Sequence, residues 1–110
     1  MSEHGEQVSV VEWCEWNHIP VFAIPNGANK SIAARMKFKA EGLRSGIPDL
    51  MIPLASGYKH GLFVEMKSKK GVVSEKQAFW MKLLEGNGYE VKLCRSADAA
   101  IAEIKNYLGR

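Results

Sequence analysis

Asp49, Glu65 and Lys67 are the residues whose types and spacing suit chemistry at a metal ion. Asp49 lies in the apolar run Pro48–Leu54, and the other two lie in a second run, Gly61–Lys67. We predict that both runs are β-strands, because each is short and apolar and the residues between them form a hairpin-sized connection. Since side chains on a strand alternate between two faces, Glu65 and Lys67 share a face.

The predicted hairpin would bring the two carboxylates together. A register centred near Gly57 places Asp49 directly opposite Glu65, with their Cβ atoms roughly 5 Å apart. Carboxylates that close repel each other, and a hard divalent cation such as magnesium would relieve the repulsion. The cation would also lower the pKa of a bound water, which Lys67 could orient, so the group suits phosphodiester hydrolysis. The alternative is a solvated ion pair in which Lys67 neutralises both carboxylates.

The remaining elements that must position these residues are four helices and two more strands. Apolar periodicity and capping residues predict helices over residues 3–17, from Ser31 to about Glu41, from Ser74 to Gly86, and from Ser96 to Leu108. The additional strands are Ile19–Ile24 and Tyr89–Cys94. The expected inner faces are Phe79, Trp80, Leu83 and Leu84 in the third helix, and Ile101, Ile104 and Leu108 in the fourth. The order α-β-α-β-β-α-β-α predicts an α/β fold with a small mixed β-sheet flanked by helices.

Length and composition favour one domain with a nucleic-acid partner. The 110 residues, 46% of them hydrophobic, are enough for a single compact domain over 1–110. Lysine and arginine exceed aspartate and glutamate by 15 to 12, a mild basic excess that suits nucleic acid. Cys14 and Cys94 lack the spacing of a zinc site, which favours buried thiols in a reducing cytoplasm. No apolar run approaches the roughly 18 residues of a membrane span, so we expect a cytoplasmic protein of a bacterial or phage-infected cell.

Four short motifs follow one another along the chain. They are Gly46-Ile-Pro-Asp49-Leu, Phe63-Val-Glu65-Met-Lys67, Gly71-Val-Val-Ser-Glu-Lys-Gln77 and Gly88-Tyr-Glu-Val. The upstream segments Pro25-Asn26-Gly27 and Gly42-Leu-Arg-Ser-Gly46 belong to the same pattern. In this order and spacing they resemble the virus-type replication-repair nuclease (VRR-NUC) family of the PD-(D/E)XK superfamily. The resemblance covers nearly the whole chain and implies a restriction-endonuclease-like core.

The resemblance also implies roles for residues of the hairpin and the third helix. Asp49 and Glu65 would bind magnesium or manganese, the backbone carbonyl of Met66 would help, and Lys67 would assist catalysis. Gln77 would be a neighbour of the active site. Its spacing from Ser74 also fits a helix capping box, and the two roles do not exclude each other.

In such nucleases the first helix contributes a further acidic or amide group near the metal. Gln7 matches the family's glutamine, and Glu3 lies one helical turn earlier on the same face. Glu6 is the competing residue, although it points about 100° away from Gln7. We prefer Glu3 with Gln7, and the alternative for both is a solvated first turn.

The function that the resemblance implies is a metal-dependent DNA endonuclease of DNA repair or phage replication. Homodimers of this family are expected to cut branched DNA such as four-way (Holliday) junctions, because two symmetric sites can address two strands. Trp13 and Trp16 offer apolar area for a dimer interface. The alternatives are a less selective nickase or flap nuclease, and a DNA-binding module without catalysis. Six cationic residues on segments beside the proposed site are candidates for phosphate contacts: Arg35, Lys37, Lys39, Arg44, Lys69 and Lys70.

Overall fold

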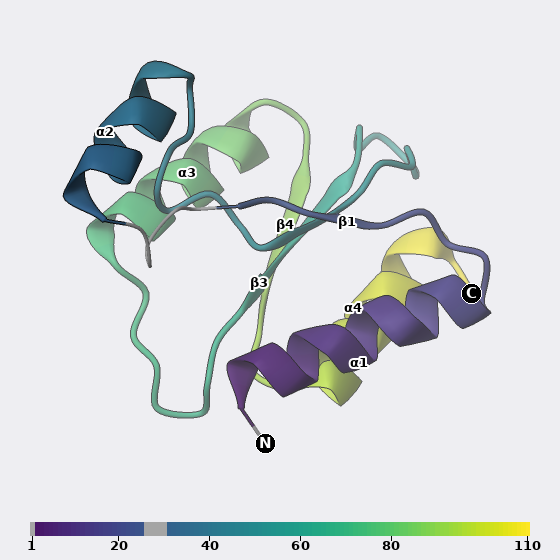
Figure 1. Ribbon diagram of the computed structural model, residues 1–110. Coiled ribbons are helices and arrows are strands. Elements are labelled where there is room, and N and C mark those ends of the chain that lie inside the picture. Colours follow the sequence, from purple (N-terminus) through teal and green to yellow (C-terminus); the bar gives the residue numbers. More distant parts are fainter. Residues whose placement is uncertain (1, 26–30) are drawn as a thin grey trace.

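The computed structural model describes residues 2–25 and 31–110 (Figure 1). These residues form the helices α1 (Glu3–Trp16), α2 (Ile32–Ala40), α3 (Glu75–Gly86) and α4 (Ala97–Leu108). They also form the strands β1 (Phe22–Ala23), β2 (Leu50–Ile52), β3 (Leu62–Met66) and β4 (Glu90–Cys94). The predicted order of elements is confirmed, although each strand is shorter than its apolar run. Asn26 and Gly27, which belong to one of the motifs, lie outside the described residues.

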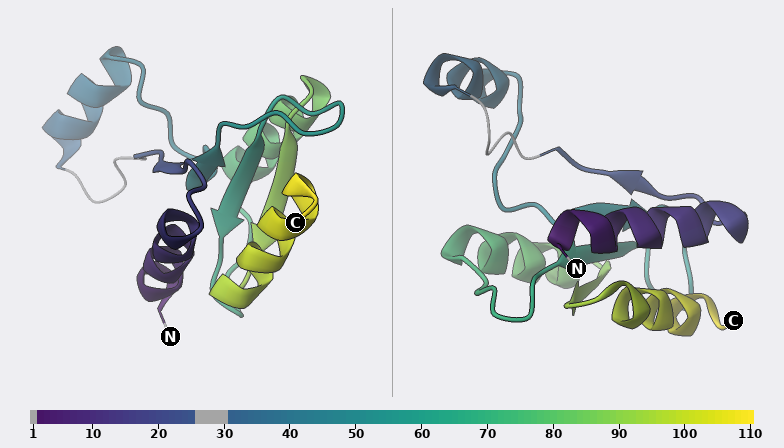
Figure 2. Two further views of the ribbon diagram at one scale, coloured as in Figure 1. Left: turned by 90° about the vertical axis from the view of Figure 1, so that its right-hand side faces the viewer. Right: turned by 60° about the horizontal axis from the view of Figure 1, so that its bottom comes forward.

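The strands form a mixed sheet in the order β1-β2-β3-β4, as the predicted fold class requires. β2 pairs antiparallel with both β1 and β3, whereas β3 and β4 are parallel. The parallel pair is connected through α3, and α1 and α4 pack against each other beside β3 (Figure 1). α2 stands away from the sheet, and none of its residues is buried (Figure 2).

The hydrophobic core lies between one face of the sheet and the pair α1 and α4. Alternate residues of the two central strands supply it, and all are almost completely buried: Leu50, Ile52, Leu62, Val64 and Met66. The helices contribute Val10, Cys14, Ala100 and Ile104 to the same cluster. Cys14 and Cys94 are both free and buried, as expected. The core thus fixes one face of the β2–β3 hairpin, and the opposite face carries the ionisable residues beside the buried Phe63.

The inner face predicted for α3 is wrong in two residues. Phe79 is 60% exposed and Leu83 is 43% exposed, whereas Trp80 and Leu84 are half-buried. Hydrophobic periodicity placed Phe79 inward, but the inner row includes the polar Gln77, which lies one helical turn before Trp80. Since α3 contacts the sheet mainly at β4, its outer apolar residues remain in solvent.

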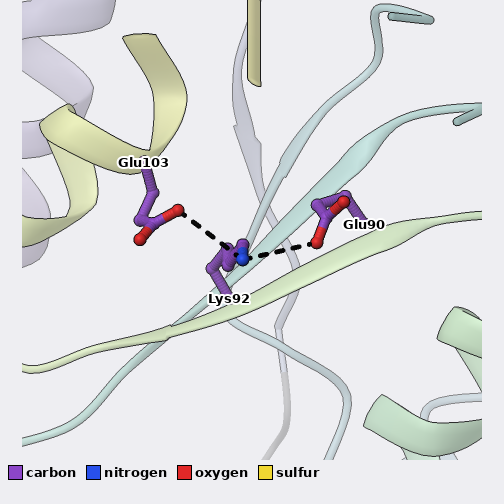
Figure 3. A network of polar contacts seen from close by, with 3 residues as sticks. All are labelled: Glu90, Lys92 and Glu103. Carbon is purple, nitrogen blue, oxygen red and sulfur yellow. Dashed lines mark ion pairs between the residues drawn. The ribbon is translucent and has the colours of Figure 1, made fainter. Parts of the chain in front are cut away.

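The free edge of β4 carries a small charged network (Figure 3). The Nζ atom of Lys92 lies 3.5 Å from a carboxylate oxygen of Glu90 and 3.8 Å from one of Glu103 in α4. Such half-exposed ion pairs add little to stability. A lysine on an edge strand does, however, disfavour pairing with the edge of another sheet.

Among residues 2–25 and 31–110, no helix combines the length and the hydropathy needed to cross a lipid bilayer.

The packing of α4 leads to a stability prediction. Ile104 is completely buried, so Ile104→Ala should lower the free energy of unfolding by about 2–5 kcal/mol, through lost burial and the cavity that remains. Ile32→Ala is the matched control, because Ile32 is 69% exposed, and it should change stability by less than about 0.5 kcal/mol. Urea unfolding followed by circular dichroism measures both. Equal losses in the two variants would contradict this description of the core.

Candidate active site

The β2–β3 register brings Asp49 and Glu65 together. Leu50 pairs with Val64 and Ile52 with Leu62, a register centred on Gly57 as predicted. Continued by one residue, it sets Asp49 opposite Glu65. Gly57 has a φ of 60°, in the left-handed region that glycine adopts without steric cost, and so allows the turn at the tip of the connection, where Ser56 pairs with Lys59.

The Asp49 carboxylate is oriented by the backbone of the neighbouring strand. The N–H of Met66 donates a hydrogen bond to its Oδ2 atom at 2.7 Å. Burial raises the pKa of Asp49, and this hydrogen bond partly opposes the increase. Met66 therefore contacts the site through its N–H, and the role of its carbonyl stays a prediction.

The Glu65 carboxyl group is buried, with only 2% of the residue exposed. This burial contradicts the alternative of a solvated surface ion pair. Burial, and then the charge of Asp49, raise the pKa of Glu65 to about 8, and protonated Glu65 donates a hydrogen bond to Asp49. In the ionised form, which cannot donate to Asp49, the buried Oε1 atom has no hydrogen-bond donor among the described residues. An ionised Glu65 would therefore need more positive charge nearby than Lys67 supplies, and a bound cation would provide it.

Gln77 has both of the roles that the sequence predicts, in the capping box of α3 and beside Glu65. Its Oε1 accepts a hydrogen bond from the N–H of Ser74 at 2.9 Å, and the Ser74 hydroxyl accepts one from the N–H of Gln77 at 3.2 Å. This capping box turns the amide group so that its Nε2 donates to Oε2 of Glu65 at 3.3 Å. The start of α3 thereby holds one oxygen of the buried carboxyl group.

Lys67 lies beside the carboxylate pair at the end of β3. Its positive charge lowers the pKa of both Asp49 and Glu65, so the ammonium group lies near them. Its backbone N–H donates to the carbonyl of Cys94 at 2.9 Å, so the position of the main chain is set by β4. The side chain is half-buried and remains accessible from solvent.

The first turn of α1 approaches the site through Glu3. The negative charge of Glu3 raises the pKa of both Asp49 and Glu65. Glu6 instead accepts a hydrogen bond from the N–H of Ala97 at the start of α4, and so fixes α1 to α4. Gln7 is half-buried, and within the described part of the chain it makes no hydrogen bond with either carboxyl group. The charge effect of Glu3, and the hydrogen bond that engages Glu6 elsewhere, therefore favour Glu3 over Glu6 as the first-helix residue of the site.

The six candidate DNA-binding residues are all exposed and fall into two groups. One group is on α2 and the loop after it: Arg35, Lys37, Lys39 and Arg44. The other, Lys69 and Lys70, lies in the turn that follows β3. The guanidinium group of Arg44 donates to the carbonyls of Lys39 and Leu43, at 2.9 and 3.1 Å, and so ties down the end of α2.

The donor atoms suit a magnesium ion held largely by water and substrate. In the described ranges, no group of three or more His, Cys, Asp or Glu side chains lies close enough together to hold a metal ion. A closed, all-protein site of the zinc type is thus not present there. Magnesium, however, typically takes one or two carboxylates and keeps several waters. The Asp49–Glu65 pair and the unpartnered Oε1 fit that requirement.

Arg95 is the residue that sequence reasoning missed near the site. Its Nη1 atom donates to the carbonyls of Ser68 and Gly71, at 2.7 and 2.8 Å, and to that of Lys69 at 3.3 Å. A single arginine after a strand forms no recognisable motif, because its partners are backbone carbonyls that any residue carries.

Comparison with known proteins agrees with the motifs. The family described as VRR-NUC domain matches residues 2–98. A solved structure described as a VRR_NUC domain protein has the same fold, with a TM-score of 0.83 and 24% identity, over 99% of this chain and 89% of that one. The Fanconi-associated nuclease 1 homolog of Arabidopsis thaliana is 34% identical in an alignment of 76 residues that covers 64% of this chain. The chain spans only 8% of the length of that relative.

The buried Glu65 leads to a prediction about stability and pH in the absence of divalent cations. Its pKa rises from the ordinary value of 4.5 to about 8 on folding, so the folded state binds the extra proton between these values. The resulting stabilisation is fully present below pH 4.5 and is lost as the pH rises through 8. We expect the melting temperature in EDTA to fall between about pH 5 and about pH 8.5.

Glu65→Gln should remove most of this fall, because glutamine carries no proton that ionises in this range. Glu85→Gln on the exposed side of α3 is the matched control and should keep it. A wild-type melting temperature that stays constant over the range, or rises, would contradict the buried carboxyl pair.

Proposed function

Because this chain belongs to the VRR-NUC family, we propose that it is a DNA nuclease domain, and more specifically a magnesium-dependent endonuclease that cuts branched DNA. The observation that supports the metal dependence is the buried Asp49–Glu65 pair, whose ionised form lacks sufficient positive charge within the protein. Manganese has the same preference for carboxylate and water ligands and should substitute.

The side chains of the site would have different roles in hydrolysis. Asp49 and Glu65 would hold the cation, and each is oriented beforehand, by the Met66 N–H and by the amide of Gln77 respectively. A magnesium ion, when bound, supplies Lewis acidity toward the phosphate and lowers the pKa of water. Lys67 would donate a hydrogen bond to a phosphate oxygen and stabilise the negative charge that develops in the transition state.

Glu3 would contribute to the cation site indirectly, through a water molecule. Its charge reaches both carboxyl groups, although it does not form a three-residue metal cluster with them. We propose that Glu3 accepts a hydrogen bond from a water around the cation. The exposed lysines and arginines of α2 and of the turn after β3 would contact DNA phosphates on either side of the cleavage point.

The preference for branched DNA rests on a proposed homodimer, in which two sites face two strands. One of its two sequence arguments needs correction: Trp13 packs against the core, so it offers little area for an interface. Trp16, by contrast, is 85% exposed, and Phe22 on β1 is 47% exposed. These residues supply apolar surface that a second copy could cover.

Cleavage of labelled DNA tests the proposed chemistry. Asp49→Asn should abolish activity, and Lys67→Ala should lower the cleavage rate about 10²–10³-fold, the usual effect of losing one transition-state donor, with DNA binding retained. Glu85→Gln and Lys105→Ala are matched controls on exposed helix positions and should cut like the wild type. The substrates are linear duplex, single strand, flap and four-way junction, each with magnesium, with manganese, and with EDTA.

The pattern of substrates distinguishes the proposal from its alternatives. Metal-dependent cutting of the junction alone, by a protein that sediments as a dimer, is the expected result. Cutting of every substrate would support the proposed hydrolysis but contradict the junction selectivity, and would favour a less selective nickase or flap nuclease. Binding without cutting in either metal would overturn the enzyme proposal in favour of a DNA-binding module.

A further inference from the structure

We infer that Arg95 is a positioning residue that fastens the turn Ser68–Gly71 and thereby holds Lys67 in place. The inference rests on the proposed function, in which Lys67 contacts the reacting phosphate. Arg95 lies between the last residue of β4 and Ser96, the N-cap of α4. Its Nη1 atom donates to carbonyls at both ends of the turn, at 2.7 Å to Ser68 and 2.8 Å to Gly71.

The backbone on either side of Arg95 is firmly held. The carbonyl of Cys94, directly before it, accepts the N–H of Lys67 at 2.9 Å. On the other side, the Ser96 hydroxyl caps α4 by accepting the N–H of Ala99 at 3.0 Å, and Glu6 of α1 accepts that of Ala97. The guanidinium group thus extends from the junction of β4 and α4, whose backbone is hydrogen-bonded to β3 and to α1. From this fixed base it can hold the turn in one position.

The turn Ser68–Gly71, held by Arg95, lies against the side chain of Lys67. Its own closure is a hydrogen bond from the N–H of Gly71 to the carbonyl of Ser68 at 3.1 Å. A Cβ atom added to Gly71 would lie 3.2 Å from Cδ of Lys67 and 3.0 Å from Oγ of Ser68. Gly71 therefore lies beside the aliphatic part of the lysine side chain. Release of the turn would uncover it and let the ammonium group sample other rotamers.

The acceptors distinguish this role from a direct contact with DNA. Arg95 is exposed, so a phosphate contact is the competing role. Its Nη1 hydrogens are already directed at main-chain carbonyls of the turn. Lysine keeps the charge, but its ammonium group ends one bond short of the position of Nη1, so Arg95→Lys weakens the contacts to the turn and separates the two roles.

The test combines Arg95→Ala and Arg95→Lys with Lys67→Ala on the four-way junction. Both Arg95 variants should lower the single-turnover cleavage rate about 10–100-fold, as expected for a misplaced catalytic group, and leave the Kd for DNA within about twofold. In the Lys67→Ala background, Arg95→Ala should cost less than about twofold more, since the two residues act as a unit. Arg110→Ala is the matched control and should have no effect.

Different results would overturn the inference. Weaker DNA binding with a smaller salt dependence, restored by Arg95→Lys, would identify a phosphate contact. An undiminished loss in the Lys67→Ala background would show that Arg95 does not act through Lys67. A loss of activity that merely follows a lower melting temperature in both variants would indicate a general structural role.

Hydrogen exchange tests the same contact without any cleavage. The amide of Gly71, measured by NMR, should exchange at least about tenfold faster in both Arg95 variants than in the wild type, because the turn opens locally. Exchange at Val64 in the centre of β3 should stay unchanged and serves as the control. Unchanged exchange at Gly71 would overturn the inference. Because a wild type that never cuts DNA would count against the proposed function alone, the two failures are distinguishable.

Discussion

The contact between the carboxyl groups of Asp49 and Glu65 is the constraint on which the arrangement of the site depends. Two acidic groups share a largely buried space, and both have a raised pKa for that reason. Packing does not require two acidic groups here, since a protein with two apolar residues at these positions would often be as stable or more stable. Glu3 adds a third negative charge nearby rather than relieving the repulsion. Polar groups held at a cost to stability are characteristic of functional sites, and a bound cation would recover that cost.

The rest of the fold keeps these groups at fixed positions, largely through main-chain atoms. The core behind the hairpin fixes the register, the Met66 N–H orients Asp49, and the capping box of α3 orients the amide of Gln77 toward Glu65. On the far side, the junction of β4 and α4 holds the backbone of Lys67 and is itself tied to α1 by Glu6. Only α2, with its exposed arginine and lysines, stands apart from this framework, where it is available to DNA (Figure 2).

Local patterns predicted the order of elements and the approach of Asp49 to Glu65, because strand alternation and the central Gly57 together define a register. They failed where a distant contact decides. Phe79 was placed inward on hydrophobicity, but the inner row of α3 is shared with Gln77, whose partner is on another strand. The preference for Glu3 over Glu6 needed no such contact, although the structure adds a reason for it, because Glu6 is held by the N–H of Ala97, some ninety residues later in the chain. Arg95 gave no signal because its acceptors are carbonyls, which carry no sequence information.

The most direct test of the central claim, that Asp49 and Glu65 form a cation site, is the melting temperature at about pH 8 as magnesium or manganese is added at constant ionic strength. A cation that binds only the folded protein raises the melting temperature as its concentration increases. We predict such a rise for the wild type and for Glu85→Gln, and its loss in Asp49→Asn. A wild-type protein that gains no stability, or an Asp49→Asn variant that gains as much as the wild type, would contradict the assignment.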